Sequence, residues 1–339
     1  MDVLIVGGTG LISTGITRQL DARGHDVTLF TRGETDPAVP VPVPDADRLR
    51  GDRNDTDRLS TAIREADPDC VIDMVCFDPE QARAAVDAVT PHCDRYVFCS
   101  TVDVYHRPVA RNPVTESARR YPNVSDYGRN KANAEDVFFD AHEAGRLDVT
   151  VLRPWNTYGE GSSLVHTFGL GTEYIARIRQ GDPIVVHGDG TGLWGPCHRD
   201  DVAGAFVGAV ESPGAAGRAY NVTSEETMAW NEYHRTVADA LDAPEPDLVH
   251  VPTDLLSEAL PEETGMLRDH FQYSTVFDNS RAERELGFEY TVDFETGVRR
   301  TVDWLDGHGT IESPDAGPSD AVVAAWREAG DTFLDAIDG

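Results

Sequence analysis

The chain contains a single lysine, and it lies four residues after a tyrosine. Lys131 is the one lysine among 29 lysine and arginine residues, and it closes the stretch YGRNK that begins at Tyr127. Residues four apart on a helix share one face. A phenol with a pKa near 10 is about one part in a thousand ionised at neutral pH, and a nearby ammonium favours its ionised form. The spacing therefore predicts that Tyr127 moves a proton and that Lys131 lowers its pKa. A chance spacing is the alternative.

Two hydroxyl residues follow the strand expected over 95–100, where the sequence reads CST. Residues at the carboxyl end of a parallel strand face the ligand crevice. We therefore expect Ser100 and Thr101 to lie near the tyrosine, where a hydroxyl can steady a developing oxyanion. Hydroxyls that merely cap the backbone at the end of a strand are the alternative.

The glycines of VLIVGGTGLIST stand between an expected strand (3–7) and an expected helix (11–23). Gly7 permits a tight turn, and Gly10 lets the backbone approach a pyrophosphate at the N-terminus of the helix. We count Leu11 and Ile12 with them as cofactor-binding residues. Ser13 replaces the third glycine of the dinucleotide-binding fingerprint and is small enough for close packing. The loop predicts a bound dinucleotide, and an ordinary turn with positive φ is the alternative.

The ends of the second and third strands indicate which dinucleotide binds. The stretch LFTRG presents Thr31 and Arg32 where a carboxylate would accept hydrogen bonds from the adenosine ribose. A guanidinium there favours a 2′-phosphate, so NADP is expected over NAD, although Arg32 could also be a solvated loop charge. Asp52, followed by Arg53, can accept from the adenine amino group. Lys131 would then hydrogen-bond the cofactor's ribose, where a compact ammonium fits better than a broad guanidinium.

Short apolar runs alternate with helix-like stretches through the first half of the chain. The expected strands are 3–7, 26–32, 48–52, 70–75, 95–100 and 149–154, and the expected helices are 11–23, 55–66, 79–90 and 126–145. Repeated β–α units of this length predict an α/β fold with a doubly wound parallel sheet of the Rossmann type. The proline-rich stretch 36–47 is expected to form a loop.

The texture of the sequence changes after Pro154, where longer loops and shorter helices (200–211 and 230–242) are expected. We predict a dinucleotide-binding domain over 1–160, to which 200–225 return. A smaller, interleaved C-terminal substrate-binding part covers mainly 161–305. Residues 306–339 form an acidic tail with an amphipathic helix.

The chain is strongly acidic, with 60 acidic residues against 29 basic ones and a formal net charge of −31. Such a surface is typical of a protein that stays hydrated at very high salt, and an acidic chain that grips a basic partner is the alternative. The charge argues against nucleic acid as a partner. Five cysteines without a CxxC pair predict neither disulfides nor a metal site. No apolar run reaches 18 residues, so we expect a cytoplasmic protein that does not enter a membrane.

Four stretches, GGTGLIS, CSTVDVY, YGRNK and LRPWNTYG, together with the stretch FDNSRAERELGF near the C-terminus, resemble the extended short-chain dehydrogenase/reductases of the NAD(P)-dependent epimerase/dehydratase family. The resemblance implies a catalytic set of Thr101, Tyr127 and Lys131. Asp103 falls where some dehydratases and decarboxylases of the family carry a second acid or base, but Val102 is not the aspartate that dehydratases place before it.

The resemblance also implies residues that touch the substrate and the nicotinamide. Pro154 matches a position beside the nicotinamide and Asn156 one beside the substrate, and His198 matches a further family position. The arginine that clamps a nucleotide-sugar diphosphate is replaced by Trp194, which can stack on a base or sugar but cannot pair with a phosphate. Arg199 or Arg268 could compensate, so we include Trp194, His198, Arg199 and Arg268 among the expected substrate-binding residues.

The function expected from the residues and the resemblance is epimerisation or dehydration of a sugar or nucleotide-sugar hydroxyl through a transient ketone. An NADP-dependent reductase or dehydrogenase with exchangeable cofactor is the first alternative. A non-catalytic, RNA-associated or sensor member of the family is the second. The resemblance further implies a homodimer formed through helices 79–90 and 126–145.

Overall fold

The computed structural model describes residues 1–34, 39, 46–315 and 317–338, so most of the loop expected over 36–47 lies outside the described residues. The chain divides into two compact units. The first comprises Met1–Tyr158, Gly195–Glu225 and Val276–Val292, and the second comprises Gly159–Trp194, Glu226–Thr275 and Asp293–Gly339.

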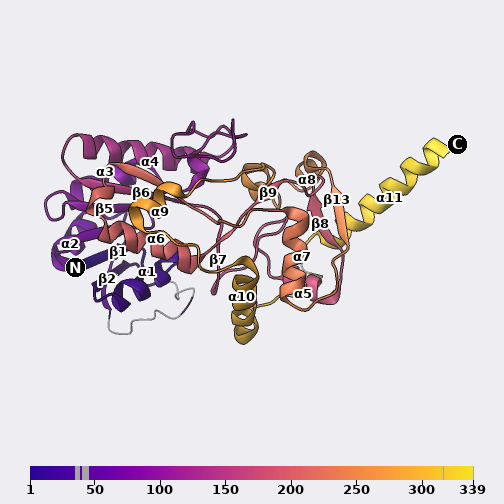
Figure 1. Cartoon of the computed structure of the whole chain (residues 1–339), viewed down its shortest axis with the longest axis horizontal. Coiled ribbons are helices and arrows are strands. Elements are labelled where there is room, and N and C mark those ends of the chain that lie inside the picture. Colours follow the sequence, from indigo (N-terminus) through magenta and orange to yellow (C-terminus); the bar gives the residue numbers. More distant parts are fainter. Residues whose placement is uncertain (35–38, 40–45, 316, 339) are drawn as a thin grey trace. The chain divides into compact units, whose positions relative to one another are not determined.

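The first unit contains a seven-stranded parallel sheet with the order β11-β6-β5-β4-β1-β2-β3 (Figure 1). Its strands are β1 (Asp2–Val6), β2 (Asp26–Thr31), β3 (Asp47–Arg50), β4 (Cys70–Asp73), β5 (Arg95–Cys99), β6 (Asp148–Pro154) and β11 (Arg218–Val222). The prediction of a doubly wound α/β sheet is confirmed. The sequence pattern did not predict β11, where Arg218 and Asn221 interrupt the apolar run.

Helices cover both faces of this sheet because each carries an apolar stripe. Side chains of α1 (Leu11–Ala22), α6 (Arg199–Glu211) and α9 (Ser280–Leu286) pack into the core on one face. Those of α2 (Thr56–Ala66), α3 (Pro79–Val89) and α4 (Asp126–Glu143) pack into the core on the other. Short elements complete the unit, namely the 3₁₀ turns η1 (Val102–Val104) and η2 (Pro213–Ala215) and the paired strands β7 (Thr157–Tyr158) and β10 (Cys197–His198).

The second unit combines short helices with two small strand pairs. β8 (Ile184–His187) runs parallel to β13 (Leu248–Val251), and β9 (Leu193–Trp194) is antiparallel to β12 (Met228–Ala229). Its helices are α5 (Glu173–Gln180), α7 (Trp230–Ala240), α8 (Thr253–Ala259), the π-helical turn η3 (Leu267–Phe271), α10 (Phe294–His308) and α11 (Ser319–Asp338). Among the described residues, no helix is long and apolar enough to cross a membrane.

Three buried histidines lie in the core of the second unit. His234 Nδ1 lies 2.8 Å from the Tyr174 hydroxyl, and His187 Nε2 lies 3.2 Å from the Phe271 carbonyl oxygen. Burial lowers the pKa of His166 and of His187 to about 4 and that of His234 to about 3. The folded unit therefore keeps these rings neutral where the unfolded chain, with an ordinary histidine pKa near 6.5, already binds protons.

We expect the second unit to lose several kcal/mol of unfolding free energy as the pH falls from about 6.5 to 4, because each pH unit of that gap is worth about 1.4 kcal/mol per histidine. Urea unfolding at pH 7 and pH 5 measures the loss. The variant His234→Gln, which can still accept from Tyr174, should be less stable at pH 7 and show a shallower pH dependence. Parallel pH curves for the two proteins would contradict this assignment.

Candidate functional site

Two glycines shape the turn between β1 and α1. One adopts a positive φ, and the other is the N-cap of the helix. Gly7 has φ +86°, and a Cβ there would lie 2.6 Å from Val75 Cγ1. Gly10 is the N-cap of α1 and makes no side-chain cap, and the first helical turn carries no acidic residue. The Ser13 hydroxyl donates to the Gly7 carbonyl oxygen at 2.8 Å, which fastens the helix to the turn. The N–H groups at this helix end therefore suit an anion such as a pyrophosphate.

A cavity of about 600 Å³ lies beside this turn, at the carboxyl ends of the sheet strands. Six of the predicted cofactor residues line it: Gly7, Gly10, Thr31, Arg32, Asp52 and Arg53. Side chains that the sequence did not mark also line it, among them Glu34, Asn54, Val75, Phe77 and Gln81. A cavity against an uncapped helix end, walled by polar strand ends, fits the adenosine and phosphate portions of a dinucleotide.

The charged residues of the cavity differ in their exposure and in their ion-pair partners. Arg32 and Glu34 are both exposed, and Arg32 Nη1 lies 3.7 Å from Glu34 Oε2. Arg53 is buried, and its Nη2 donates to Asp73 Oδ2 at 2.6 Å. Burial lowers the pKa of Arg53, but the Asp73 carboxylate more than offsets it and the net direction is upward. Arg53 therefore braces the cavity wall, and its guanidinium is directed at Asp73 rather than at a cofactor.

Thr101, Asp103 and Tyr127 meet where η1 touches the start of α4. The Thr101 hydroxyl donates to Asp103 Oδ2 at 3.1 Å and accepts from the Asp103 N–H at 3.1 Å. Ser125 caps α4 by accepting from the Gly128 N–H at 3.1 Å. Thr101 also lies close enough to Tyr127 to lower the pKa of its phenol. The structure therefore brings the predicted hydroxyl, carboxylate and phenol together.

The pKa of Tyr127 moves in the direction opposite to the one expected from the sequence. Burial raises it, the Cys99 and Asp103 side chains raise it further, and the hydrogen bond from Thr101 opposes the rise. Tyr127 as a whole is 42% exposed, so only part of the residue is buried. Without cofactor, Tyr127 is therefore a protonated phenol at neutral pH.

Lys131 is 1% exposed and points into the unit. Its Nζ donates to the carbonyl oxygens of Cys76 and Cys99, each at 2.7 Å, and lies 5.9 Å from the centre of the Tyr127 ring. Burial lowers the pKa of this amine. An ammonium has three N–H donors, so two are held by backbone and one is left for a ligand near Tyr127.

Comparison with known proteins identifies the family. The profile of the NAD dependent epimerase/dehydratase family matches residues 3–223. The chain belongs to this family. Its members include epimerases, dehydratases and reductases, and the chain is accordingly an NAD(P)-dependent enzyme of the oxidoreductase type.

Individual relatives lie at moderate similarity. The 2'-dehydrokanamycin reductase of Streptomyces kanamyceticus is 29% identical over 83% of this chain and 78% of its own length. The chloroplast stem-loop binding protein of 41 kDa b of Arabidopsis thaliana is 26% identical over 91% of this chain and 80% of its own. A solved UDP-glucose-4-epimerase from Stenotrophomonas maltophila, with bound NAD, superimposes with a TM-score of 0.76 at 23% identity. The superposition covers 91% of this chain and 99% of the epimerase chain, which supports a shared fold.

The Ser100 side chain is buried and is bonded to a carboxylate of α4. Its hydroxyl donates to Glu135 Oε1 at 2.6 Å, and both side chains are buried. Arg153 donates to the same carboxylate through Nε at 2.8 Å and Nη2 at 2.6 Å, and Arg120 adds a second cation at 2.9 Å. The expected cofactor role of Ser100 is therefore corrected to a structural one. Glu135 could have been noticed, because it lies four residues after Lys131 on the same helix face.

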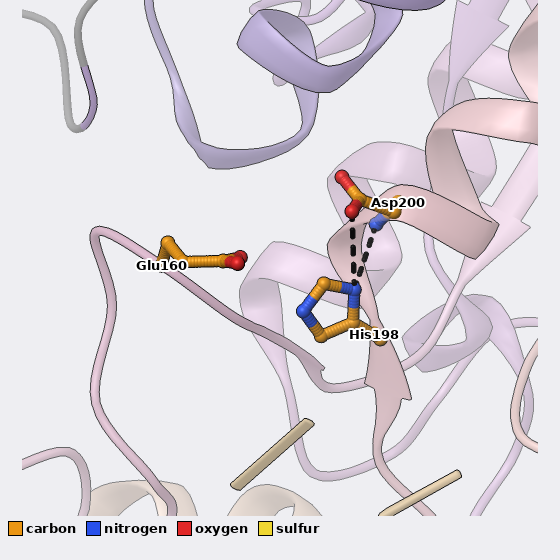
Figure 2. Close-up of side chains that lie close together, drawn as sticks. All are labelled: Glu160, His198 and Asp200. Atoms are coloured by element: carbon orange, nitrogen blue, oxygen red, sulfur yellow. Dashed lines mark hydrogen bonds and ion pairs between the residues drawn. The ribbon is translucent and has the colours of Figure 1, made fainter. Parts of the chain in front are cut away.

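The expected substrate residues are divided between the two units. In the first unit, Asn156 Nδ2 is buried and has no hydrogen-bond partner among the described residues, and Pro154 ends β6. His198 Nδ1 accepts from the Asp200 N–H at 3.2 Å, as Figure 2 shows. Arg199 is buried and its Nη2 donates to Thr14 Oγ1 of α1 at 2.7 Å, so it ties two helices together rather than compensating for the missing clamp.

Trp194 and Arg268 belong to the second unit. Trp194 is fully buried, stacked on Trp230 with ring centres 4.9 Å apart and in edge contact with Phe271 at 5.0 Å. Its ring faces are used inside the protein, so we no longer assign it to a base or sugar. Arg268 Nη1 donates to the Pro261 carbonyl oxygen at 2.7 Å.

Gly128 sets the distance between Tyr127 and its hydroxyl neighbours. A Cβ at this position would lie 2.2 Å from the Asp103 carbonyl oxygen and 2.8 Å from Pro122 Cγ. We expect Gly128→Ala to push α4 away from η1, to lower turnover at least about tenfold and to destabilise the fold by about 1–3 kcal/mol. Steady-state kinetics and urea unfolding measure both effects. Gly307→Ala in α10, where a Cβ meets nothing within 4 Å, is the control and should be neutral.

Proposed function

We propose that this enzyme transfers a hydride between NAD(P) and one hydroxyl-bearing carbon of a sugar or sugar-like molecule, which passes through the ketone. The observation that supports the proposal is the meeting of Thr101, Tyr127 and the buried Lys131, whose Nζ lies 4.9 Å from the ring of Phe77, a residue that lines the cavity. A hydroxyl, a phenol and an ammonium at one place are the groups that proton transfer to a carbonyl oxygen requires.

The chain's own residues would act as follows. Tyr127 gives a proton to the substrate oxygen in reduction and takes it in oxidation. The Thr101 hydroxyl, which donates to Asp103 Oδ2 in the free protein, would turn its proton to the substrate oxygen as negative charge develops on it. The unpartnered Asn156 amide offers a further donor to a ligand. When bound, NAD(P) supplies or accepts the hydride.

The direction of the reaction separates two candidates. Epimerisation or dehydration needs Tyr127 to act first as a base, whereas reduction needs it protonated. The similarity to a protein named 2'-dehydrokanamycin reductase favours the reductase candidate with exchangeable cofactor. The resemblance to the stem-loop binding protein does not favour a nucleic-acid partner for a chain with net charge −31.

Denaturing the purified protein and measuring the released nucleotide tests these candidates. An epimerase retains its cofactor through turnover, so about one NAD(P) per chain is expected, while a reductase releases little and oxidises added NADPH or NADH with keto-sugars. Absence of both nucleotide release and binding would overturn the proposed function.

We also propose that α3 and α4 form a homodimer interface, which light scattering tests.

We propose NADP as the preferred cofactor, with Arg32 as the residue that pairs with the 2′-phosphate. Glu34 opposes this preference because it lies 3.7 Å from the guanidinium. We expect Arg32→Ala to weaken NADPH binding about tenfold and to change NADH binding little, and Glu34→Gln to strengthen NADPH binding. Fluorescence titration of both cofactors provides the measurement. An equal loss for both would show that Arg32 does not discriminate.

A further inference from the structure

The surroundings of Lys131 contain aromatic rings as well as carbonyls. Its Nζ lies 4.9 Å from the ring centre of Phe77 and 4.9 Å from that of Phe98, both within the range of a cation–π interaction. The two nearby acids that favour its charge, Asp73 and Glu135, are already paired with arginines. Within the described part of the chain, the ammonium is thus held by two carbonyls and by ring faces rather than by an ion pair.

Phe77 differs from the other ring because it stands at the cavity. Phe98 is fully buried in the sheet core, whereas Phe77 is 46% exposed and lines the cavity beside the glycine turn. The Phe77 ring therefore lies 4.9 Å from Nζ and at the same time lines the cavity.

The loop that carries Phe77 is fixed although its ring is exposed. Asp78 caps α3 by accepting from the Glu80 and Gln81 N–H groups at 2.9 and 2.8 Å. Gln81 Oε1 accepts from the Phe77 N–H at 2.6 Å, and Gln81 Nε2 donates to Asn54 Oδ1 at 2.9 Å. The exposure of the ring therefore reflects its placement and not a loose backbone.

We propose that Phe77 is a positioning residue for Lys131, whose ring holds the ammonium against the two carbonyls and shields it from bulk water on the cavity side. The inference rests on the proposed function for the role of Lys131 in catalysis. The evidence for the contact itself is the geometry around Nζ. The remaining N–H is thereby kept directed at the ligand and at Tyr127. Phe77 acts through Lys131 and is not itself a catalytic residue.

The single lysine permits a direct test that needs no substrate. An amine-reactive reagent modifies only Lys131 and the α-amino group of Met1, so the rate at Lys131 can be read by peptide mass against an internal reference. Phe77→Leu keeps apolar bulk and removes the ring, whereas Phe77→Tyr keeps the ring. Phe333→Leu makes the same exchange at a 64% exposed position of α11 and is the matched control.

We expect Phe77→Leu to raise the modification rate of Lys131 about fivefold at fixed pH and to move the midpoint of its pH–rate profile to lower pH, because the charged form loses the ring. Phe77→Tyr should stay within about twofold of the native protein, and Phe333→Leu should match it. An unchanged rate in Phe77→Leu, or an equal rise in Phe77→Tyr, would overturn the proposal. Added NADP or NAD should slow the modification in every variant. If neither nucleotide slows the modification and Lys131 still reacts faster in Phe77→Leu, the proposed function fails. The positioning role of Phe77 would stand in that case.

Discussion

Tyr127→Phe is expected to lower turnover about 10²–10⁴-fold, the range that a positioned proton donor or acceptor contributes, while NAD(P) affinity changes less than about twofold. The variant removes one hydroxyl and keeps the ring that lies 5.9 Å from the Lys131 ammonium. Steady-state rates with a keto-sugar and fluorescence titration with NADPH separate the two effects.

The control and the pH profile sharpen this prediction. Tyr121 is 46% exposed and its hydroxyl bonds Asp136 rather than the catalytic group, so Tyr121→Phe should keep its rate. Because the pKa of Tyr127 is raised, a proton needed for reduction is present throughout the neutral range and is lost only at strongly alkaline pH. Reductive turnover should therefore not fall between pH 6 and 9. If Tyr127→Phe keeps the native rate, the proton donor is another group, and Asp103 is the next to test.

The features that the sequence predicted correctly depend on neighbours along the chain. The glycine turn, the β–α alternation and the Tyr127–Lys131 spacing are local, and the structure brings Thr101 to them because strand ends share one edge of a parallel sheet. Two side chains of the predicted site have hydrogen-bond partners far along the chain, which the sequence does not indicate. Ser100 turns to Glu135, 35 residues away, and Arg53 turns to Asp73, 20 residues away.

Burial explains the remaining differences between expectation and structure. A resemblance assigns Trp194 to a family position but says nothing of the rings that close over it in the second unit. The pKa of Tyr127 was expected to fall because a lysine is near, yet burial of the phenol raises it, and the Cys99 and Asp103 side chains raise it further. Spacing predicts which groups meet, but the surrounding atoms decide the sign of their effect.

Lys131→Arg replaces the one lysine of a sequence in which the other 28 of the 29 lysine and arginine residues are arginine. Both carbonyls lie 2.7 Å from Nζ and both phenyl ring centres lie 4.9 Å from it, which leaves no room for a planar guanidinium. We expect the variant to keep its positive charge and yet lose turnover at least about 100-fold. Cofactor binding should weaken about tenfold, and overpacking should lower the unfolding free energy by about 1–3 kcal/mol.

The matched control is Arg64→Lys on the exposed surface of α2, which should alter neither rate nor stability and would show that lysine and arginine exchange freely elsewhere. Lys131→Met completes the series because it removes the charge and leaves the Cys76 and Cys99 carbonyls without their donor. If charge alone mattered, Lys131→Arg would behave as the native enzyme and only Lys131→Met would fail. If the compact shape of the ammonium matters, as the packing indicates, both variants lose turnover, and the arginine variant alone is strained by excess volume.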